Sequence, residues 1–143
     1  MEEGQVKSLK RIAKNLDKEV NSLVINRNCV NQIIEDLKKS LENLLAEIKK
    51  EKELSRQTLS FEFEKFFEEC EKRTQKIKDE IKRNQDIMKG LTSELKEKFS
   101  EQKKYENLLK KAEAKLRKRD KLNEQKQLDE LVQQRNFVTK VKG

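Results

Sequence analysis

Apolar residues recur along the first third of the chain in alternating steps of three and four. The series continues for about six heptads, broken only by Arg27, and most of the positions between are charged. This a/d pattern predicts a coiled-coil helix from about residue 5 to about residue 53. Five further apolar residues are predicted to widen the stripe on one side: Ile12, Val24, Ile25, Ile33 and Leu45. The predicted seam consists of Val6, Leu9, Ala13, Leu16, Val20, Leu23, Val30, Ile34, Leu37, Leu41, Leu44 and Ile48.

A second, looser apolar series follows residue 60 and predicts a second helix over about residues 61–138. Asn84, Lys98 and Gln102 stand at its seam positions, where polar groups weaken packing and fix the register. Gly90 lies in phase with the series, and a lone Gly costs a helix only about 1 kcal/mol relative to Ala. We therefore predict a helix that continues through Gly90. The other seam members are Phe63, Phe66, Phe67, Cys70, Ile77, Ile81, Met88, Leu91, Leu95, Tyr105, Leu109, Ala112 and Leu116.

The heptad pattern lapses between the two helices, and we place a turn at about residues 54–60. Ser55, Thr58 and Ser60 are candidate N-caps there. A turn at this point predicts an all-α fold: residues 1–143 form a single long two-helix antiparallel coiled-coil hairpin with an overhanging C-terminal helix. Val6 would then lie opposite about residue 108, and everything beyond about residue 110 would extend past the first helix.

Composition supports a helical, non-catalytic chain. Of its 143 residues 43% are charged, a composition that also occurs in disordered chains. The recurrence of apolar residues every three and four positions favours helices instead. No apolar run of membrane-spanning length and no signal-peptide pattern occurs, which indicates a soluble, non-secreted chain. Cys29 and Cys70 are expected as two half-buried thiols in a reducing cytosol. The chain has no His and no Gly-rich phosphate loop, so we expect neither an enzyme nor a cofactor.

Positive charge gathers toward the C-terminus. Residues 101–143 hold thirteen basic and seven acidic residues, which accounts for six of the eight net positive charges. A basic helix of this kind suits a solvated face, an acidic cavity in a partner protein, or nucleic acid, whose binding would depend strongly on salt. No aromatic residues or groove-binding motif accompany it, which disfavours nucleic acid. This basic collar consists of Lys110, Lys111, Lys115, Arg117, Lys118, Arg119 and Lys121.

The beginning of the predicted second helix has the opposite charge and is rich in aromatic residues. Residues 61–71, FEFEKFFEECE, contain four Phe and five Glu against one Lys. Some of these rings can close the end of the hairpin as core. Adjacent rings point in different directions, however, so they cannot all face one narrow seam. We therefore expect a docking patch for a partner, formed by Phe61, Phe63, Phe66 and Phe67.

Near the C-terminus, NEQKQLDELVQQR (residues 123–135) resembles the C-terminal pattern of the FliJ family of the bacterial flagellar type III export apparatus. That pattern, E-Q-x-x-L-D-E-[IL]-x-x-x-R, is matched by Glu124, Gln125, Leu128, Asp129, Glu130, Leu131 and Arg135. The stretch SLKRI at residues 8–12 is similar to the start of alphaproteobacterial members, but Ile12 stands where the family tends to have an aromatic residue. The specific motifs cover about 18 residues, and the architecture covers the whole chain.

The resemblance implies a central-stalk-like coiled coil whose terminal helices enter a hexameric export ATPase. It also implies contacts with the cytoplasmic domain of an export-gate membrane protein and with export chaperones. The protein would be cytoplasmic and peripherally associated with the membrane at the gate. The predicted hairpin, for its part, would be monomeric when free. Leu128, Leu131 and Val132 would pack inside the ATPase ring, together with the motif residues around them. The injectisome counterpart of this system is not distinguished by the sequence.

Two other classes of function remain open. A structural coiled coil could homodimerise through long parallel helices, and light scattering separates this obligate dimer from a monomeric hairpin. A basic helical protein could bind nucleic acid, which a salt titration with duplex and single-stranded probes tests.

Overall fold

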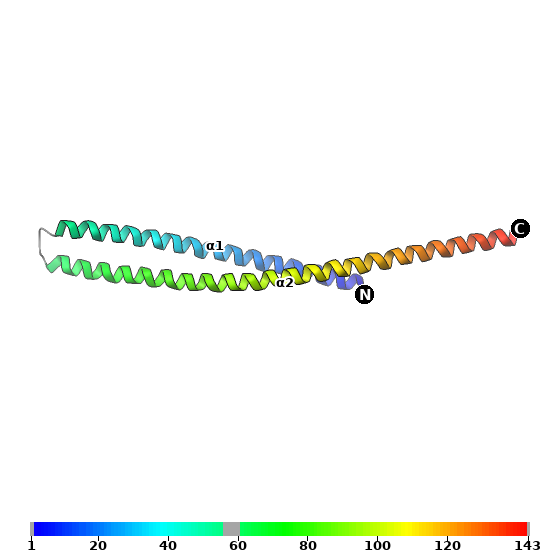
Figure 1. Cartoon of the computed structure of the whole chain (residues 1–143), viewed down its shortest axis with the longest axis horizontal. Coiled ribbons are helices and arrows are strands. Elements are labelled where there is room, and N and C mark those ends of the chain that lie inside the picture. The colour runs from blue at the N-terminus through cyan, green and yellow to red at the C-terminus, as the bar shows by residue number, and fades with distance from the viewer. Residues whose placement is uncertain (1, 56–60, 143) are drawn as a thin grey trace. The chain divides into compact units, whose positions relative to one another are not determined.

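The computed structural model describes residues 2–55 and 61–142, with side chains for residues 2–54 and 63–138. Helix α1 spans Glu2–Ser55 and helix α2 spans Phe61–Lys142, and no strand occurs in these ranges. The protein is thus all-helical, with two long helices in contact (Figure 1). Both extend beyond the predicted limits of about 5–53 and 61–138. Thr58 and Ser60, two of the three candidate caps, lie outside the described residues.

The described chain groups into two units. One contains Met1–Lys18 and Phe99–Gly143, and the other contains Glu19–Lys98. Each has its own core: Val6, Leu16 and Ala112 are buried in the first unit. In the second unit the buried residues are Val20, Ile34, Leu44, Cys70, Ile81 and Leu95.

The residues predicted for the two seams lie where α1 and α2 pack against each other. Every seam residue named from the sequence is buried or half-buried. Arg27, which breaks the apolar series of α1, is exposed, because its long charged side chain can reach water from a seam position. Ile12, Val24, Ile25, Ile33 and Leu45, which the sequence adds to the stripe on one side, are exposed by 37–61%, so α2 leaves much of these side chains uncovered.

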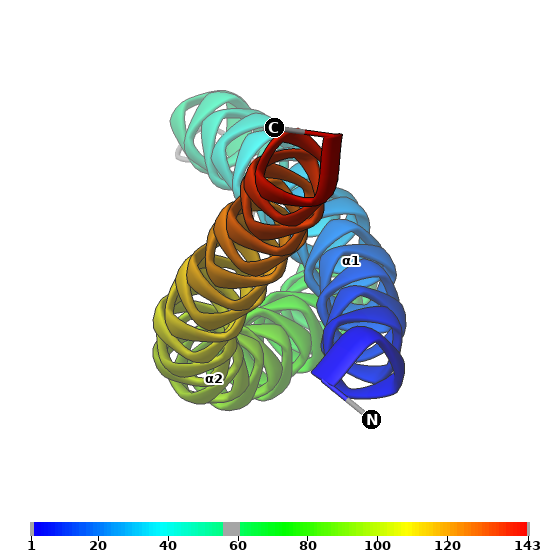
Figure 2. The same cartoon turned by 90° about the vertical axis from the view of Figure 1, so that its right-hand side faces the viewer.

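In the first unit, residues later in α1 contact residues earlier in α2. The Asp17 carboxylate accepts a 2.7 Å hydrogen bond from the Gln102 amide, and Lys10 lies 3.9 Å from Glu113. Arg119 then reaches the first turn of α1. The blue start of α1 accordingly lies beside the yellow part of α2 in Figure 1 and Figure 2. The prediction that α2 overhangs from about residue 110 is therefore wrong, because α1 covers α2 as far as Arg119. Helix α1 begins earlier than predicted, and it pairs with later residues of α2 than the predicted register gives.

The second unit shows the same order of contacts. Lys98 forms a 2.9 Å ion pair with Glu19, whereas the Lys52 ammonium lies 5.8 Å from the centre of the Phe67 ring. Asn84, the remaining polar seam residue, donates a 2.8 Å hydrogen bond to the Glu80 carbonyl of its own helix. Each of the three polar seam residues of α2 is half-buried and has a hydrogen-bonding or ionic partner.

Gly90 does not interrupt α2, which is continuous from Phe61 to Lys142. No atom lies within 4 Å of the position that a Cβ at residue 90 would occupy. The glycine therefore has no steric role in the helix. The prediction of a continuous helix is confirmed at this position.

The two cysteines differ in environment. Cys70 is buried and Cys29 is exposed, and both are free thiols, so the expectation of two half-buried cysteines is wrong. Neither described helix has a stretch apolar enough to cross a membrane.

Candidate functional site

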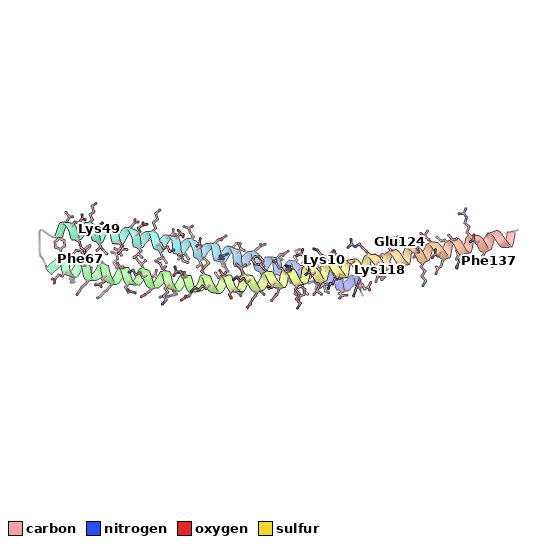
Figure 3. All side chains as sticks on the ribbon, viewed as in Figure 1. Lys10, Lys49, Phe67, Lys118, Glu124 and Phe137 are labelled. Atoms are coloured by element: carbon pink, nitrogen blue, oxygen red, sulfur yellow. The ribbon has the colours of Figure 1, made fainter. Side chains whose placement is uncertain are left out.

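The end of α2 is a single helix that is open to solvent. All side chains from residue 120 to residue 138, here called the C-terminal segment, are exposed. In Figure 1 the orange and red part of α2 has no second helix beside it, and Figure 3 shows Glu124 and Phe137 on this part. The segment contains every residue of the predicted ATPase-binding motif: Glu124, Gln125, Leu128, Asp129, Glu130, Leu131, Val132 and Arg135.

The motif gives this segment one apolar face. Leu128, Leu131 and Val132 are exposed by 62%, 60% and 56%, and their spacing of three and four residues makes them neighbours on the helix surface. Exposed apolar clusters of this kind commonly mark protein-binding sites. The structure thus groups these three predicted residues on one accessible surface.

Two equally exposed apolar residues of the segment lie on other faces. Leu122 is exposed by 63% and Phe137 by 69%. Phe137 is nine residues from Leu128, which places it on about the opposite side of the helix. Neither was predicted as a site residue, and single exposed apolar residues are common on protein surfaces.

The basic collar divides into six exposed basic residues and one half-buried arginine, Arg119. Arg119 lies 3.6 Å from Glu2, 3.5 Å from Glu3 and 3.6 Å from the neighbouring Asp120. It is half-buried and already engaged with acidic groups, so it belongs to the contact with α1 more than to a free basic surface. The other six members are exposed: Lys110, Lys111, Lys115, Arg117, Lys118 and Lys121.

A hollow of about 630 Å³ adjoins this collar. Arg117, Lys118 and Lys121 line it together with Asp120, Glu124 and Ala114. Because carboxylates alternate with the basic groups, the surface is not the purely cationic groove that a phosphate backbone prefers. Side chains of both charge signs therefore line this surface.

The aromatic cluster of α2 is partly covered. Phe63, Phe66 and Phe67 are all half-buried, and the Phe61 side chain lies outside the described residues. Phe67 is the centre of the cluster: its ring centroid is 6.4 Å from that of Phe63 and 5.6 Å from that of Phe66. In Figure 3 the Phe67 ring lies between α1 and α2. The three rings therefore combine a core role with an accessible edge.

A hollow of about 300 Å³ opens beside Phe67. Its wall combines apolar groups with one ammonium and one carboxylate: Leu45, Ile48, Lys52, Phe67, Glu71 and Thr74. Leu45 is exposed by 46%, so an apolar group entering the hollow would contact both helices of this unit. The predicted docking patch thus extends from α2 onto α1.

Among residues 2–54 and 63–138, no three His, Cys, Asp or Glu side chains come together as a metal site. Comparisons with protein-family models, curated proteins and solved structures find no match to this chain.

Proposed function

We propose that α1 and α2 form one antiparallel coiled-coil hairpin. Two observations support this arrangement. Within each unit, contacts link successive residues of α1 to residues of α2 in reverse order. The covered positions also follow the three-and-four spacing of a coiled-coil seam. In a parallel homodimer, the alternative, each helix would pair with the same helix of a second copy. That arrangement does not explain the contacts between α1 and α2.

The function that these features support best is that of a stalk in bacterial flagellar type III protein export, bound to a hexameric export ATPase. The observation that carries the proposal is the C-terminal segment, where Leu128, Leu131 and Val132 form an apolar face on a helix with all side chains exposed. A lone helix with such a face gains stability by docking in a groove or ring of another protein. The family resemblance names the ATPase as that protein.

The exposed lysines of the basic collar have a supporting role in this proposal. They stand directly before the C-terminal segment or, in the case of Lys121, at its beginning, so they would meet the mouth of the ring as the segment enters. Attraction to acidic subunit surfaces would speed association and would weaken as salt increases. Replacing Lys118 and Lys121 by Gln is expected to lower the association rate more than it raises the dissociation rate.

The docking patch is proposed to bind the cytoplasmic domain of an export-gate protein. The hollow beside Phe67 is lined by apolar groups together with Lys52 and Glu71. It suits a partner segment with one apolar side chain and adjacent charges of both signs. Export chaperones are further proposed partners, and the protein would then work in the cytoplasm at the membrane gate without catalysing a reaction itself.

Binding to the ATPase can be tested with two matched double variants. Leu128→Ala with Leu131→Ala removes two apolar residues from the motif face, whereas Leu122→Ala with Phe137→Ala removes two equally exposed ones from other faces. We expect the first variant to weaken binding by about tenfold or more and to abolish stimulation of ATP hydrolysis. The second is expected to change both by less than about threefold.

Binding isotherms and ATPase rates with the purified hexamer give both readouts. If the first variant binds and stimulates normally, the stalk proposal is wrong. Circular dichroism of both variants verifies that helicity is unchanged, so that a loss of binding reflects the lost contact.

A further inference from the structure

A stretch of α1 stands out from the rest of the chain by its low charge. From Val20 to Ile34 the only charged residue is Arg27, although 43% of the chain is charged. Seven of these fifteen residues are Val, Leu or Ile, and four are Asn. A helix that is apolar on several sides is normally covered on several sides.

Helix α2 covers only one side of this stretch. Val20 and Ile34 are buried in the seam, whereas Val24 is exposed by 38% and Ile25 by 61%. Ile25 is two residues from the seam position Leu23, which is about 200° around the helix, so its side chain projects away from α2. The outward surface, here called the uncharged face, consists of Asn21, Val24, Ile25, Asn28 and Gln32, and all five are exposed.

Opposite charges flank the uncharged face along α1. Residues 7–18 contain five basic residues and one acidic residue, whereas residues 35–47 contain four acidic residues and two basic ones. Lys18 is seven residues before Ile25, and Glu35 is seven residues after Asn28. Seven residues are about two helical turns, so each charge lies on the same side of α1 as the uncharged residue nearest to it.

We propose that the uncharged face is covered by a second copy of this chain, with the two α1 helices antiparallel about residues 26 and 27. Ile25 of each copy then packs on Asn28 of the other, and Lys18 of each copy lies opposite Glu35 of the other. Two-fold symmetry makes each of these pairs occur twice. A second copy fits this face because, in the antiparallel arrangement, the nearly uncharged centres of the two α1 helices meet each other. The basic end of each α1 then meets the acidic end of the other.

The association is weak, because the uncharged face is small. Interfaces that bury less than about 1,200 Å² in total belong to transient complexes. We therefore expect a weak, transient dimer, whose dissociation constant sedimentation equilibrium measures. The C-terminal segment takes no part in this contact, so binding to the ATPase and self-association are separable.

Sedimentation equilibrium of the full-length protein over a wide range of concentration tests the proposal. We expect a reversible monomer–dimer equilibrium that Ile25→Gln weakens about tenfold or more. Ile87→Gln is the matched control, because Ile87 is exposed by 47% on the other helix of the same unit. It is expected to leave the dissociation constant unchanged.

Charge reversal tests the antiparallel orientation. Lys18→Glu and Glu35→Lys are each expected to weaken the dimer by about three- to tenfold, and the double variant is expected to restore it. In a parallel pair, Lys18 would face its own copy, so the double variant would restore nothing. A chain that stays monomeric at the highest concentrations, a dimer insensitive to Ile25→Gln, or a double variant without rescue overturns the proposal.

Discussion

Leu95 and Leu128 are leucines of the same helix with opposite environments. Leu95 is exposed by 4% and Leu128 by 62%. Leu95→Ala is expected to lower the free energy of unfolding by about 2–4 kcal/mol, because it removes buried contacts from a narrow core. Leu128→Ala is expected to change it by less than about 0.5 kcal/mol. Urea denaturation followed by circular dichroism measures both values, and equal effects would show that the seam is wrongly assigned.

Gly90 offers a stabilising substitution. Gly90→Ala adds a methyl group to open space in the middle of α2, so no contact is strained. It is expected to raise the free energy of unfolding by about 1 kcal/mol, since Ala loses less backbone entropy than Gly on forming a helix.

Gly4→Ala is the control for this substitution, as Gly4 also has open space around its Cβ position. It lies in the first turn of α1, where helix ends fray, so a smaller gain is expected. Thermal denaturation of both variants gives the comparison. A melting temperature lowered by Gly90→Ala would contradict the expectation.

At the scale of the element, α2 changes character at Arg119. Up to this residue it is covered by α1, and from residue 120 to residue 138 it has exposed side chains only. Most of the stability of a helix in a protein comes from tertiary packing, which this segment lacks. Backbone amides after residue 123 are therefore expected to exchange with solvent much faster than those near Leu95, as measured by hydrogen exchange. Equal protection in both regions would show that the segment is covered in the free protein.

Truncation after Asn123 separates stability from binding. The removed residues bury little surface in the free chain, so the free energy of unfolding is expected to fall by less than about 1 kcal/mol. Stimulation of the export ATPase is expected to disappear, because the whole motif is lost. A truncated protein that still activates the ATPase would remove this segment from the proposed function.

For the whole molecule, the hairpin proposal predicts a monomer of 17.1 kDa in dilute solution. Light scattering at concentrations well below the dissociation constant of the proposed antiparallel dimer measures this mass. An obligate dimer under these conditions would favour the parallel coiled coil, since each helix would then need a second chain to cover its seam. The concentration-dependent antiparallel dimer proposed above stays compatible with the monomer.

The sequence by itself determined the helices and their covered faces. Heptad spacing is local, so the residues that face a neighbour, such as Leu16 and Leu95, follow from the order of side chains alone. The same holds for the continuity of α2 through Gly90, because one glycine costs less than the surrounding residues contribute. The open apolar face formed by Leu128, Leu131 and Val132 was also readable from spacing.

Only the tertiary structure decided the register of the two helices and how much of each helix the other one buries. Periodicity repeats every seven residues and cannot say which turn of α2 meets which turn of α1. Contacts such as Arg119 with Glu2 settle this within their unit, and they move the beginning of the uncovered helix from about residue 110 to beyond Arg119. Exposure of Ile25 likewise depends on how far α2 reaches around α1. A local pattern fixes which side of a helix is apolar, but the position and reach of the neighbouring helix fix how much of that side is buried.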